Sequence, residues 1–377
     1  MLHTINYLTK IVFGSGAAAS MATELDGLNV KQPLLITDPG LIESGVFQLF
    51  LEKAGFTAAT PVFAETPSNP TEHAVHEALA MLRQHDCDGL VAVGGGSSID
   101  LAKGVALLAT HAPPLRQYAV IDGGASRITA QVLPLIAVPT TAGTGSEVGR
   151  GSLICMDDEH KLGFISPYLI PSVAVCDPEM TASLPQYLTA ATGMDAIAHC
   201  IETYLSPRFN PPAEAIALDG LQRAIHHIEE ASGPTPSMAA RSEMMMAAVE
   251  GALAFQKGLG AVHSLSHALG GFQELPLHHG TLNAVLLPTV LRFNQSHCEE
   301  KFATLRTVMG LPAGDDLAVF FEGLNERLHL PTRLSALGVT ADLFDRVSAW
   351  ACEDHSTPTN PRPATLQDFR AMLEEAL

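Results

Sequence analysis

Histidine residues gather in one short stretch of the chain. The segment HSLSHALGGFQELPLHHG, residues 263–280, holds His263, His267, His278 and His279, whereas the whole chain of 377 residues has 16 histidines. Imidazole nitrogens bind divalent transition ions, and a histidine also transfers protons near neutral pH. The segment contains no cysteine and no pair of carboxylates. A metal site here would therefore need a further ligand from another part of the chain.

The segment ATGMDAIAHCIETYLS, residues 191–206, offers such a ligand. Asp195 and His199 are four residues apart, which places both side chains on one face of a helix. Their neighbours are apolar, so an internal helix would bury them, and a buried carboxylate is costly unless it is paired or bound to a metal. A hydrogen bond between the two side chains in a core helix is the alternative explanation.

His263 and His267 repeat the spacing of four residues, although either of them could be a helix-end or core histidine. Together, one aspartate and three or four histidines without a cysteine predict nitrogen and oxygen ligation of Fe²⁺, Zn²⁺, Co²⁺ or Mn²⁺. Spacing alone does not separate these ions. One Asp and three His ligands would leave a coordination position open for a substrate oxygen, on which the ion acts as a Lewis acid.

Two loops rich in small side chains predict a dinucleotide site. VAVGGGSSIDLAKGVA, residues 91–106, runs from a strand into a helix, and its glycines let backbone N–H groups approach a pyrophosphate. PTTAGTGSE, residues 139–147, follows a second strand and supplies hydroxyl donors. The fingerprint GxGxxG is absent, so a strand-to-helix turn without a ligand is the alternative for the first loop.

Three charged residues accompany these loops. Asp38 ends the predicted strand PLLITD, where a carboxylate can accept hydrogen bonds from an adenosine ribose, and this favours NAD over NADP because a 2′-phosphate would be repelled. A turn-forming role in TDPG is the alternative. Asp100 and Lys103 lie three residues apart on the helix after the glycines. For these two, an ordinary surface pair is the alternative to a place in the cofactor site.

The first half of the chain alternates strand and helix patterns. Residues 72–86 have the apolar spacing of a helix, and strands are predicted at 33–38, 89–94, 133–139 and 172–178. Such alternation is typical of a mostly parallel, doubly wound sheet, which binds ligands beyond the carboxyl ends of its strands. We therefore predict an α/β dinucleotide-binding domain over residues 1–180.

The pattern changes after DPEMTASLP, residues 177–185. No further strand is predicted, and long segments with helical periodicity follow near 187–206, 213–231, 238–255, 279–294, 314–327 and 340–352. The segments SGPTPS and STPTNPRP are predicted to be loops. We therefore predict an all-helical domain over residues 181–377 that carries the metal and the catalytic groups.

Composition excludes several classes of protein. Hydrophobic residues make up 47% of the chain and charged residues 16%, which argues against disorder. The formal net charge of −19 argues against binding nucleic acid, which needs basic patches. The six cysteines are dispersed and predicted to be reduced. The N-terminus has no signal-peptide pattern, and no apolar run is long enough to span a membrane. We expect a cytoplasmic location.

In combination, these motifs resemble the iron-containing (group III) alcohol dehydrogenases. The resemblance covers most of the chain and rests on GGGSSID, PTTAGTGSEV, DPEMTASLP, GMDAIAHCIE, GLGAVHSLSHALGG and HHGTLNAVLLP, which occur in the order of that family. It implies a nucleotide-binding α/β domain, a helical metal domain and a cleft between them for hydride transfer. It also implies NAD and Fe²⁺ as cofactors, with Zn²⁺ as the alternative ion, and a homo-oligomer, often a dimer.

The resemblance also implies roles for single residues. The family's ligand pattern falls on Asp195, His199, His263 and the histidine before a glycine, here His279. The commonest family form of this last segment is two residues shorter, so His278 is the alternative ligand. His267 becomes a residue beside the site that suits a proton relay. Cofactor contacts fall on Asp38, Gly95, Gly96, Ser97, Thr140, Thr141, Thr144 and Lys161, and we add Asp100 to this set.

The resemblance implies oxidation of a small-molecule alcohol, or reduction of its aldehyde. Arg150 and Lys257 are cations that could pair with a substrate carboxylate, and with HHGTLNAVLLP they resemble the ω-hydroxy-acid branch that acts on 4-hydroxybutyrate. Surface or interdomain roles are the alternative for both cations. A maleylacetate-reductase-like ketoacid reductase and a non-catalytic nucleotide- and metal-binding protein are the alternative functions.

Overall fold

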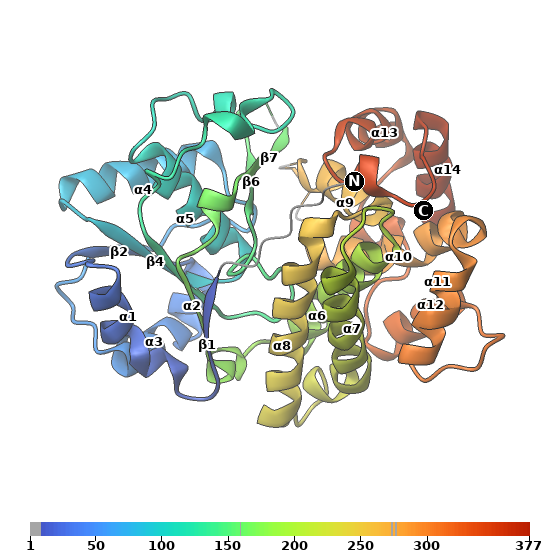
Figure 1. Cartoon of the computed structure of the whole chain (residues 1–377), viewed down its shortest axis with the longest axis horizontal. Helices are drawn as coiled ribbons and strands as arrows, with labels where there is room; N and C mark the ends of the chain where they lie inside the picture. The colour runs from blue at the N-terminus through green and yellow to red at the C-terminus, as the bar shows by residue number, and fades with distance from the viewer. Residues whose placement is uncertain (1–8, 159, 273, 276) are drawn as a thin grey trace. The chain divides into compact units, whose positions relative to one another are not determined.

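The structure, a computed structural model, describes residues 9–158, 160–272, 274–275 and 277–377. The chain forms two compact units, coloured from blue to green and from green to red in Figure 1. Among the described residues, one unit consists of residues 9–141 together with Gly145–Leu184, and the other consists of Ala142–Thr144 and Pro185–Leu377. The assignment of functions to residues 1–180 and 181–377 stays a prediction.

A parallel six-stranded sheet forms the centre of the first unit, with the order β1-β8-β5-β4-β2-β3. The strands are β1 (Lys10–Phe13), β2 (Pro33–Ile36), β3 (Val62–Phe63), β4 (Gly89–Gly94), β5 (Leu135–Pro139) and β8 (Val173–Cys176). The four strands predicted from the sequence are confirmed as β2, β4, β5 and β8. The remaining two, β1 and β3, are edge strands of four and two residues, too short to give a periodic pattern.

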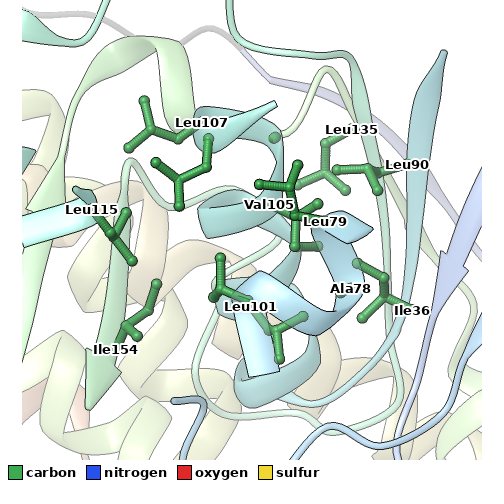
Figure 2. Packing of buried hydrophobic residues seen from close by; sticks show 14 of the residues in the cluster. Ile36, Ala78, Leu79, Leu90, Leu101, Val105, Leu107, Leu115, Leu135 and Ile154 are labelled. Atoms are coloured by element: carbon green, nitrogen blue, oxygen red, sulfur yellow. The ribbon is translucent and has the colours of Figure 1, made fainter. Parts of the chain in front are cut away.

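Alternate residues of the central strands face opposite layers of helices. Ile36 and Leu90 point into one apolar cluster, which helices α4 and α5 complete, whereas Leu35 and Val91 point into another, which α3 helps to form. Figure 2 shows Leu101, from α5, among the side chains of the first cluster. The helices of this unit are α1 (Met21–Gly27), α2 (Pro39–Glu43), α3 (Val46–Ala54), α4 (Glu72–Gln84) and α5 (Gly96–Leu108).

An antiparallel hairpin of β6 (Gly151–Cys155) and β7 (Lys161–Ile165) is added to the parallel sheet unit. Ile154 and Phe164 lie in the same apolar cluster as α5. This hairpin was not predicted from the sequence, because each strand has only five residues and their outward positions are partly buried. The hairpin fixes the segment around residues 145–151 beside α5.

Helices make up the second unit, and among its described residues there is no strand. They are α6 (Gln186–Leu205), α7 (Pro211–Ala231), α8 (Met238–Ala254), α9 (Ala261–Gly270), α10 (His279–Asn294), α11 (Glu299–Val308), α12 (Leu317–Arg327), α13 (Phe344–Glu353) and α14 (Leu366–Ala376). The predicted fold class, an α/β domain followed by an all-helical one, is confirmed. Three helices of ten or eleven residues, α9, α11 and α14, were not among the predicted segments.

Helices α6, α9 and α10 form the interior of the helical unit. Every residue of α9 is buried, and α6 is buried from Thr189 to Leu205. Helix α6 packs against α7, α8 and α10, and α9 packs against α10 and α13. The small residues of α6 allow this close packing, because Gly193 and the alanines leave room for neighbouring helices. Among the described residues, no helix combines the length and the hydropathy that crossing a membrane requires.

Candidate functional site

Four predicted ligands meet in the interior of the helical unit. The Oδ1 atom of Asp195 lies 3.6 Å from the Nε2 atom of each of His199, His263 and His279. The Asp195 and His263 side chains are 2% and 1% exposed, whereas that of His279 is 21% exposed. Three imidazole nitrogens therefore surround one carboxylate oxygen, and one edge of the group remains accessible to a small molecule.

Three helices bring these side chains together. Asp195 and His199 are one turn apart on α6, His263 lies in the first turn of α9, and His279 is the first residue of α10. Gly280 permits this arrangement, because a Cβ atom at that position would lie 2.3 Å from the carbonyl oxygen of Ala191. The start of α10 can thus approach α6 closely enough for His279 to reach Asp195.

Glu202 orients one of the imidazoles, and the sequence analysis missed this residue. Its Oε2 atom lies 2.6 Å from Nδ1 of His263, and its Oε1 atom accepts a hydrogen bond from the backbone N–H of Val262 at 2.7 Å. With the proton on Nδ1, the Nε2 lone pair of His263 faces Asp195. A signal existed, since residues 195, 199 and 202 follow the spacing of one helix face.

Asn283 is a second residue of the site that was not predicted. It lies one turn after His279 on α10, and its Nδ2 atom donates a hydrogen bond to Oδ1 of Asp195 at 2.7 Å. The same nitrogen lies 3.3 Å from Nε2 of His263 and 3.2 Å from Nε2 of His279. The amide therefore fixes the carboxylate that the three imidazoles share.

Burial and charge set the protonation of the group. Burial lowers the pKa of His199 to about 4, so this imidazole offers a free lone pair at neutral pH. Burial would raise the pKa of Asp195, but the surrounding histidines hold it well below its usual range. Burial opposes protonation of His263, yet its contacts with Asp195 and Glu202 raise its pKa to about 9. A bound cation would displace that proton.

The donor set fits a divalent transition ion. Donors arranged tetrahedrally at about 2.1 Å from one ion lie roughly 3.4 Å from each other. The distances between Asp195 Oδ1 and the three imidazole nitrogens are 3.6 Å. Asp195, His263 and His279 each offer one ligand atom, and these three atoms lie within 4.8 Å of one another. Nitrogen and oxygen donors without a thiolate suit Fe²⁺ or Zn²⁺.

The two other histidines of residues 263–280 have different surroundings. His278 precedes α10 as its N-cap, and its Nδ1 atom accepts a hydrogen bond from the backbone N–H of Thr281 at 3.3 Å. His267 lies beside the four-residue group, with its ring 5.4 Å from that of His279 at an interplanar angle of 10°. Burial lowers the pKa of His267 to about 4. Of the two adjacent histidines, the geometry brings His279 to Asp195.

Most of the predicted cofactor residues gather at one edge of the parallel sheet. Gly95 and Thr140 directly follow β4 and β5, and Asp38 lies two residues after the end of β2; the carboxyl ends of these strands share that edge. An Oδ atom of Asp38 lies 3.5 Å from the hydroxyl of Ser98, and a Cβ atom at Gly95 would lie 3.4 Å from the Thr141 side chain. Burial raises the pKa of Asp38. The start of α5 there exposes backbone N–H groups that can bind phosphate.

Asp38 also has a local structural role. Its Oδ1 atom accepts a hydrogen bond from the backbone N–H of Leu41 at 3.0 Å, which caps α2. The turn-forming role and the position at the sheet edge are therefore both present.

Ser97 donates a hydrogen bond to the carbonyl of Ser68 at 2.5 Å. Thr144 belongs to the helical unit, whereas Thr141 belongs to the sheet unit.

Asp100 and Lys103 are not an ordinary surface pair, so that alternative is wrong. The Asp100 carboxylate accepts hydrogen bonds from the Ser146 hydroxyl at 2.5 Å and the Leu153 backbone N–H at 2.8 Å. The Nζ atom of Lys103, whose side chain is fully buried, donates to Ser146 and to the carbonyl of Gly151. Both residues hold the segment before β6 against α5, and a cofactor role for Asp100 stays a prediction.

Lys161 and Arg150 also belong to the sheet unit. Lys161 is the first residue of β7, and its Nζ atom donates a hydrogen bond to Oδ1 of Asn69 at 2.9 Å. Arg150 is half-buried, and its backbone carbonyl accepts a hydrogen bond from Ser166 at 3.0 Å. Contacts of Lys161 with a cofactor and of Arg150 with a substrate stay predictions.

Lys257 does not bind a substrate carboxylate, which corrects one expectation from the sequence. Its side chain is fully buried, and Nζ lies 2.9 Å from the Glu214 carboxylate. The ammonium group also donates to the carbonyls of Thr203 and Ser206 at 2.9 and 2.7 Å. These carbonyls lie at the end of α6, where the helix dipole favours a positive charge. Lys257 is thus neither a substrate ligand nor a surface residue, but a cap of α6.

Comparison with known proteins agrees with this arrangement. Residues 9–178 match the model of the iron-containing alcohol dehydrogenases, and residues 189–377 match the C-terminal model of the same family. The chain is 54% identical to the 4-hydroxybutyrate dehydrogenase of Cupriavidus necator over 99% of both chains. It is 33% identical to the NAD-dependent methanol dehydrogenase of Bacillus methanolicus over 97% of both chains. A crystal structure of 1,3-propanediol oxidoreductase superimposes with a TM-score of 0.91, at 34% identity and over all of both chains.

The fold and the buried histidine–carboxylate group thus define an oxidoreductase of the metal-dependent alcohol dehydrogenase class. The chain belongs to the iron-containing alcohol dehydrogenase family, which confirms the predicted resemblance. It is an enzyme with NAD-linked alcohol dehydrogenase activity. The alternative of a non-catalytic binding protein is therefore not retained.

Proposed function

We propose that this enzyme oxidises the terminal hydroxyl group of a short ω-hydroxy acid with NAD⁺, and that Asp195, His199, His263 and His279 bind its Fe²⁺ ion. The observation that carries the metal proposal is the equal distance of 3.6 Å between Asp195 Oδ1 and three imidazole nitrogens. A divalent ion bound to these four residues would account for a buried carboxylate oxygen that three histidines share.

When bound, the ion would supply Lewis-acid polarisation of the substrate oxygen. The protein's own groups would hold the substrate and move its proton. His267 lies next to His263 and His279, with ring centroids 5.6 and 5.4 Å away, so it is within reach of a group bound at the exposed edge of His279. We propose that His267 takes part in passing the hydroxyl proton to solvent while hydride leaves the same carbinol carbon for NAD⁺.

The substrate class is supported by the relative from Cupriavidus necator, a 4-hydroxybutyrate dehydrogenase that is 54% identical over 99% of both chains. A molecule of this kind has a hydroxyl group at one end and a carboxylate at the other. The carboxylate needs a cation or hydrogen-bond donors. The ammonium group of Lys257 already binds the carbonyl groups at the end of α6 and the Glu214 carboxylate. Arg150 is therefore the remaining candidate of the two cations named from the sequence.

NAD is proposed to bind at the carboxyl edge of the parallel sheet. Asp38 is proposed to contact the adenosine ribose, and the start of α5 is proposed to contact the pyrophosphate. The other residues proposed to contact NAD are Gly95, Gly96, Ser97, Asp100, Thr140, Thr141, Thr144 and Lys161. This assigns the dinucleotide to the domain of residues 1–180 and the metal to that of residues 181–377. Replacing Asp38 with alanine is expected to lower the preference for NAD⁺ over NADP⁺ by about 10-fold or more, as measured by kcat/KM for both.

The metal proposal is tested by purifying the protein without oxygen and measuring its metal content and turnover. One iron per chain is expected in the wild type. His263→Ala should lose both the metal and about 100-fold or more of the turnover. Exposed His226→Ala on α7 serves as the control and should keep both. A His263→Ala protein with its full metal content and full turnover would contradict the proposal.

The substrate proposal is tested by comparing kcat/KM for 4-hydroxybutyrate and 1-butanol with NAD⁺ as oxidant. The wild type should prefer the hydroxy acid. Arg150→Ala should raise KM for 4-hydroxybutyrate by about 10-fold and leave 1-butanol unchanged, whereas exposed Arg208→Ala should change neither. Equal efficiency on the two substrates, in the wild type and in Arg150→Ala, would refute a carboxylate-binding role.

We also propose that the enzyme acts in the cytoplasm as a homodimer. The described cysteines are all free thiols, which suits a reducing compartment. Several large apolar side chains are exposed, among them Phe209 at 60% and Val319 at 58%. Light scattering coupled to size-exclusion chromatography measures the mass directly, and a monomeric mass would refute the dimer.

A further inference from the structure

A carboxylate from the far end of the chain contacts His267. Asp354, which follows α13, places Oδ2 2.9 Å from Nδ1 of His267, although the two residues are 87 positions apart. The side chains are 4% and 9% exposed for His267 and Asp354. We infer that Asp354 is a positioning residue that fixes the tautomer and ring orientation of His267, an inference that rests on the relay role proposed above.

The hydrogen bond decides which nitrogen of His267 is available. An ionised carboxylate only accepts, so Nδ1 of His267 must carry the proton that it donates to Asp354. The lone pair then lies on Nε2, on the far side of the ring from Asp354. A proton acceptor needs such a bare nitrogen. Without Asp354, the imidazole could adopt the other tautomer, whose Nε2 is already protonated.

Packing fixes the orientation of the same ring. The His267 ring lies nearly parallel to that of His279, at 10°, and to that of His355, at 18°, with centroids 5.4 Å away in both cases. Rotation of His267 would break the bond to Asp354 and both ring contacts. The imidazole is therefore held between the proposed metal ligand His279 and the end of α13.

Asp354 is itself fixed by the turn that follows α13. Its Oδ1 atom accepts a hydrogen bond from the backbone N–H of Ser356 at 2.8 Å, which leaves Oδ2 for His267. Nδ1 of His355 lies 3.6 Å from the same Oδ2 atom. The backbone around Asp354 is also bonded, from Asp354 N–H to Ala351 and from Thr357 N–H to Asp354. The carboxylate thus has little freedom to turn away from His267.

A purely structural role is the competing explanation, since the same bond ties the end of α13 to α9. The two explanations differ in what Asp354→Asn does. An amide of the same shape preserves the packing, but it no longer enforces a proton on Nδ1 of His267. We expect kcat to fall by about 10- to 1,000-fold, with the iron content, KM for NAD⁺ and melting temperature close to wild type. Asp354→Glu should recover part of the lost kcat.

Glu353→Gln provides the matched control. It makes the same change from carboxylate to amide on the exposed residue before Asp354 and keeps the 2.9 Å bond from Asp354 to His267. Its kcat should stay within about 3-fold of wild type. If Asp354→Asn and Glu353→Gln have the same kcat, or if Asp354→Asn lowers the melting temperature without lowering kcat in the folded enzyme, the positioning role is refuted.

The tautomer itself is measured by ¹⁵N NMR of histidine-labelled enzyme loaded with diamagnetic Zn²⁺. The His267 signals, assigned by their loss in His267→Gln, should show a protonated Nδ1 and a bare Nε2 in the wild type. Asp354→Asn should show a mixture or the reverse. A wild type with a protonated Nε2, or an unchanged pattern in Asp354→Asn, would overturn the inference. Two metals per chain in the wild type and one in Asp354→Asn would also overturn it, because His267, Asp354 and His355 would then be a second metal site.

Failure of this inference is distinguishable from failure of the proposed function. Full turnover in His267→Ala would remove the relay role, and with it the basis for a positioning residue. A large loss in His267→Ala together with a normal kcat in Asp354→Asn would leave the relay role in place and refute only the part assigned to Asp354.

Discussion

At the scale of single residues, the readiness of the site to bind a metal depends on buried pairs of polar groups. Glu202 and Asp195 stand at opposite nitrogens of His263, at 2.6 and 3.6 Å. Glu202 holds the proton on Nδ1 of the ring, and Asp195 faces Nε2, whose proton a bound cation would displace. A histidine in this arrangement is prepared to bind a cation before the cation arrives, which reduces the reorganisation that binding requires.

Glu202→Gln tests whether Glu202 orients His263 for metal binding. The amide keeps the shape of the side chain, but it no longer provides a charged acceptor for Nδ1 of His263. Affinity for the metal should fall by about 10- to 100-fold, as measured by competition of the apoprotein with a fluorescent chelator. Glu243→Gln, on the partly exposed face of α8, is the control and should not change the affinity. Equal affinities in Glu202→Gln and wild type would contradict the orienting role.

A second residue-scale prediction concerns stability and pH. Burial raises the pKa of Glu250 to about 8, helped by the hydrogen bond and the charge of Asp219, while Arg223 opposes the shift from 3.3 Å. The folded chain therefore keeps a proton on Glu250 between its ordinary pKa of 4.5 and about 8, whereas the unfolded chain has lost it. This contribution to stability is fully present below the lower value and is lost as pH rises through the higher one.

Glu250→Gln should remove that pH dependence. The amide stays neutral and can still donate to Asp219. Between about pH 6 and about pH 9, the free energy of unfolding of the wild type should decrease by roughly 1–3 kcal/mol more than that of the variant. Urea denaturation at both pH values measures the difference. Parallel pH profiles for the two proteins would show that Glu250 is ionised in the folded chain at neutral pH.

At the scale of elements, the position of α10 relative to α6 decides whether the ligands meet. Gly280→Ala would place a Cβ atom 2.3 Å from the backbone oxygen of Ala191, which cannot move without moving α6. We expect a loss of roughly 1–3 kcal/mol in the free energy of unfolding, together with weaker metal binding because His279 precedes the displaced turn. Calorimetry and metal titration measure the two effects.

Gly193→Ala on α6 is the matched control for Gly280→Ala. Its Cβ atom would meet Ile228 and Met244, in each case at 2.9 Å from the end of a flexible side chain. These atoms can shift, and an alanine within a helix gains up to about 1 kcal/mol over glycine. The control should therefore change stability little and leave the metal affinity unaltered. Similar losses in both variants would contradict the proposed importance of the α6–α10 approach.

At the scale of the whole molecule, the two compact units carry different ligands in the proposed function. Each ligand should therefore stabilise mainly the unit that binds it. Chelation of the metal is expected to increase amide hydrogen exchange in α6, α9 and α10, and to leave β2, β4 and β5 nearly unchanged. With the ion at 100 times its dissociation constant, the linked stabilisation is about 2.7 kcal/mol. Uniform changes in exchange across both units would contradict this separation.

Sequence patterns predicted a large part of the fold. Strands β2, β4, β5 and β8 were recognised from runs of apolar residues, and helices α4, α6, α7, α8, α10, α12 and α13 were recognised from helical periodicity. The strands that were missed are short, as in β1 and β3, or depend on a partner strand, as in β6 and β7. A short strand is stabilised by its neighbours in the sheet, so its own residues give little signal.

Residue type and spacing alone determined the chemistry that the chain can perform. An aspartate and a histidine four residues apart, two further histidine segments and two glycine- or threonine-rich loops specified the classes of ligand. The tertiary structure alone decided which groups act together. It brought His279 to Asp195 and left His278 as a helix cap, added Glu202 and Asn283 to the group, and assigned Lys257 to the end of α6. The physical reason is that hydrogen bonds and ion pairs act over a few ångströms, and these distances join residues that lie 50 to 90 positions apart.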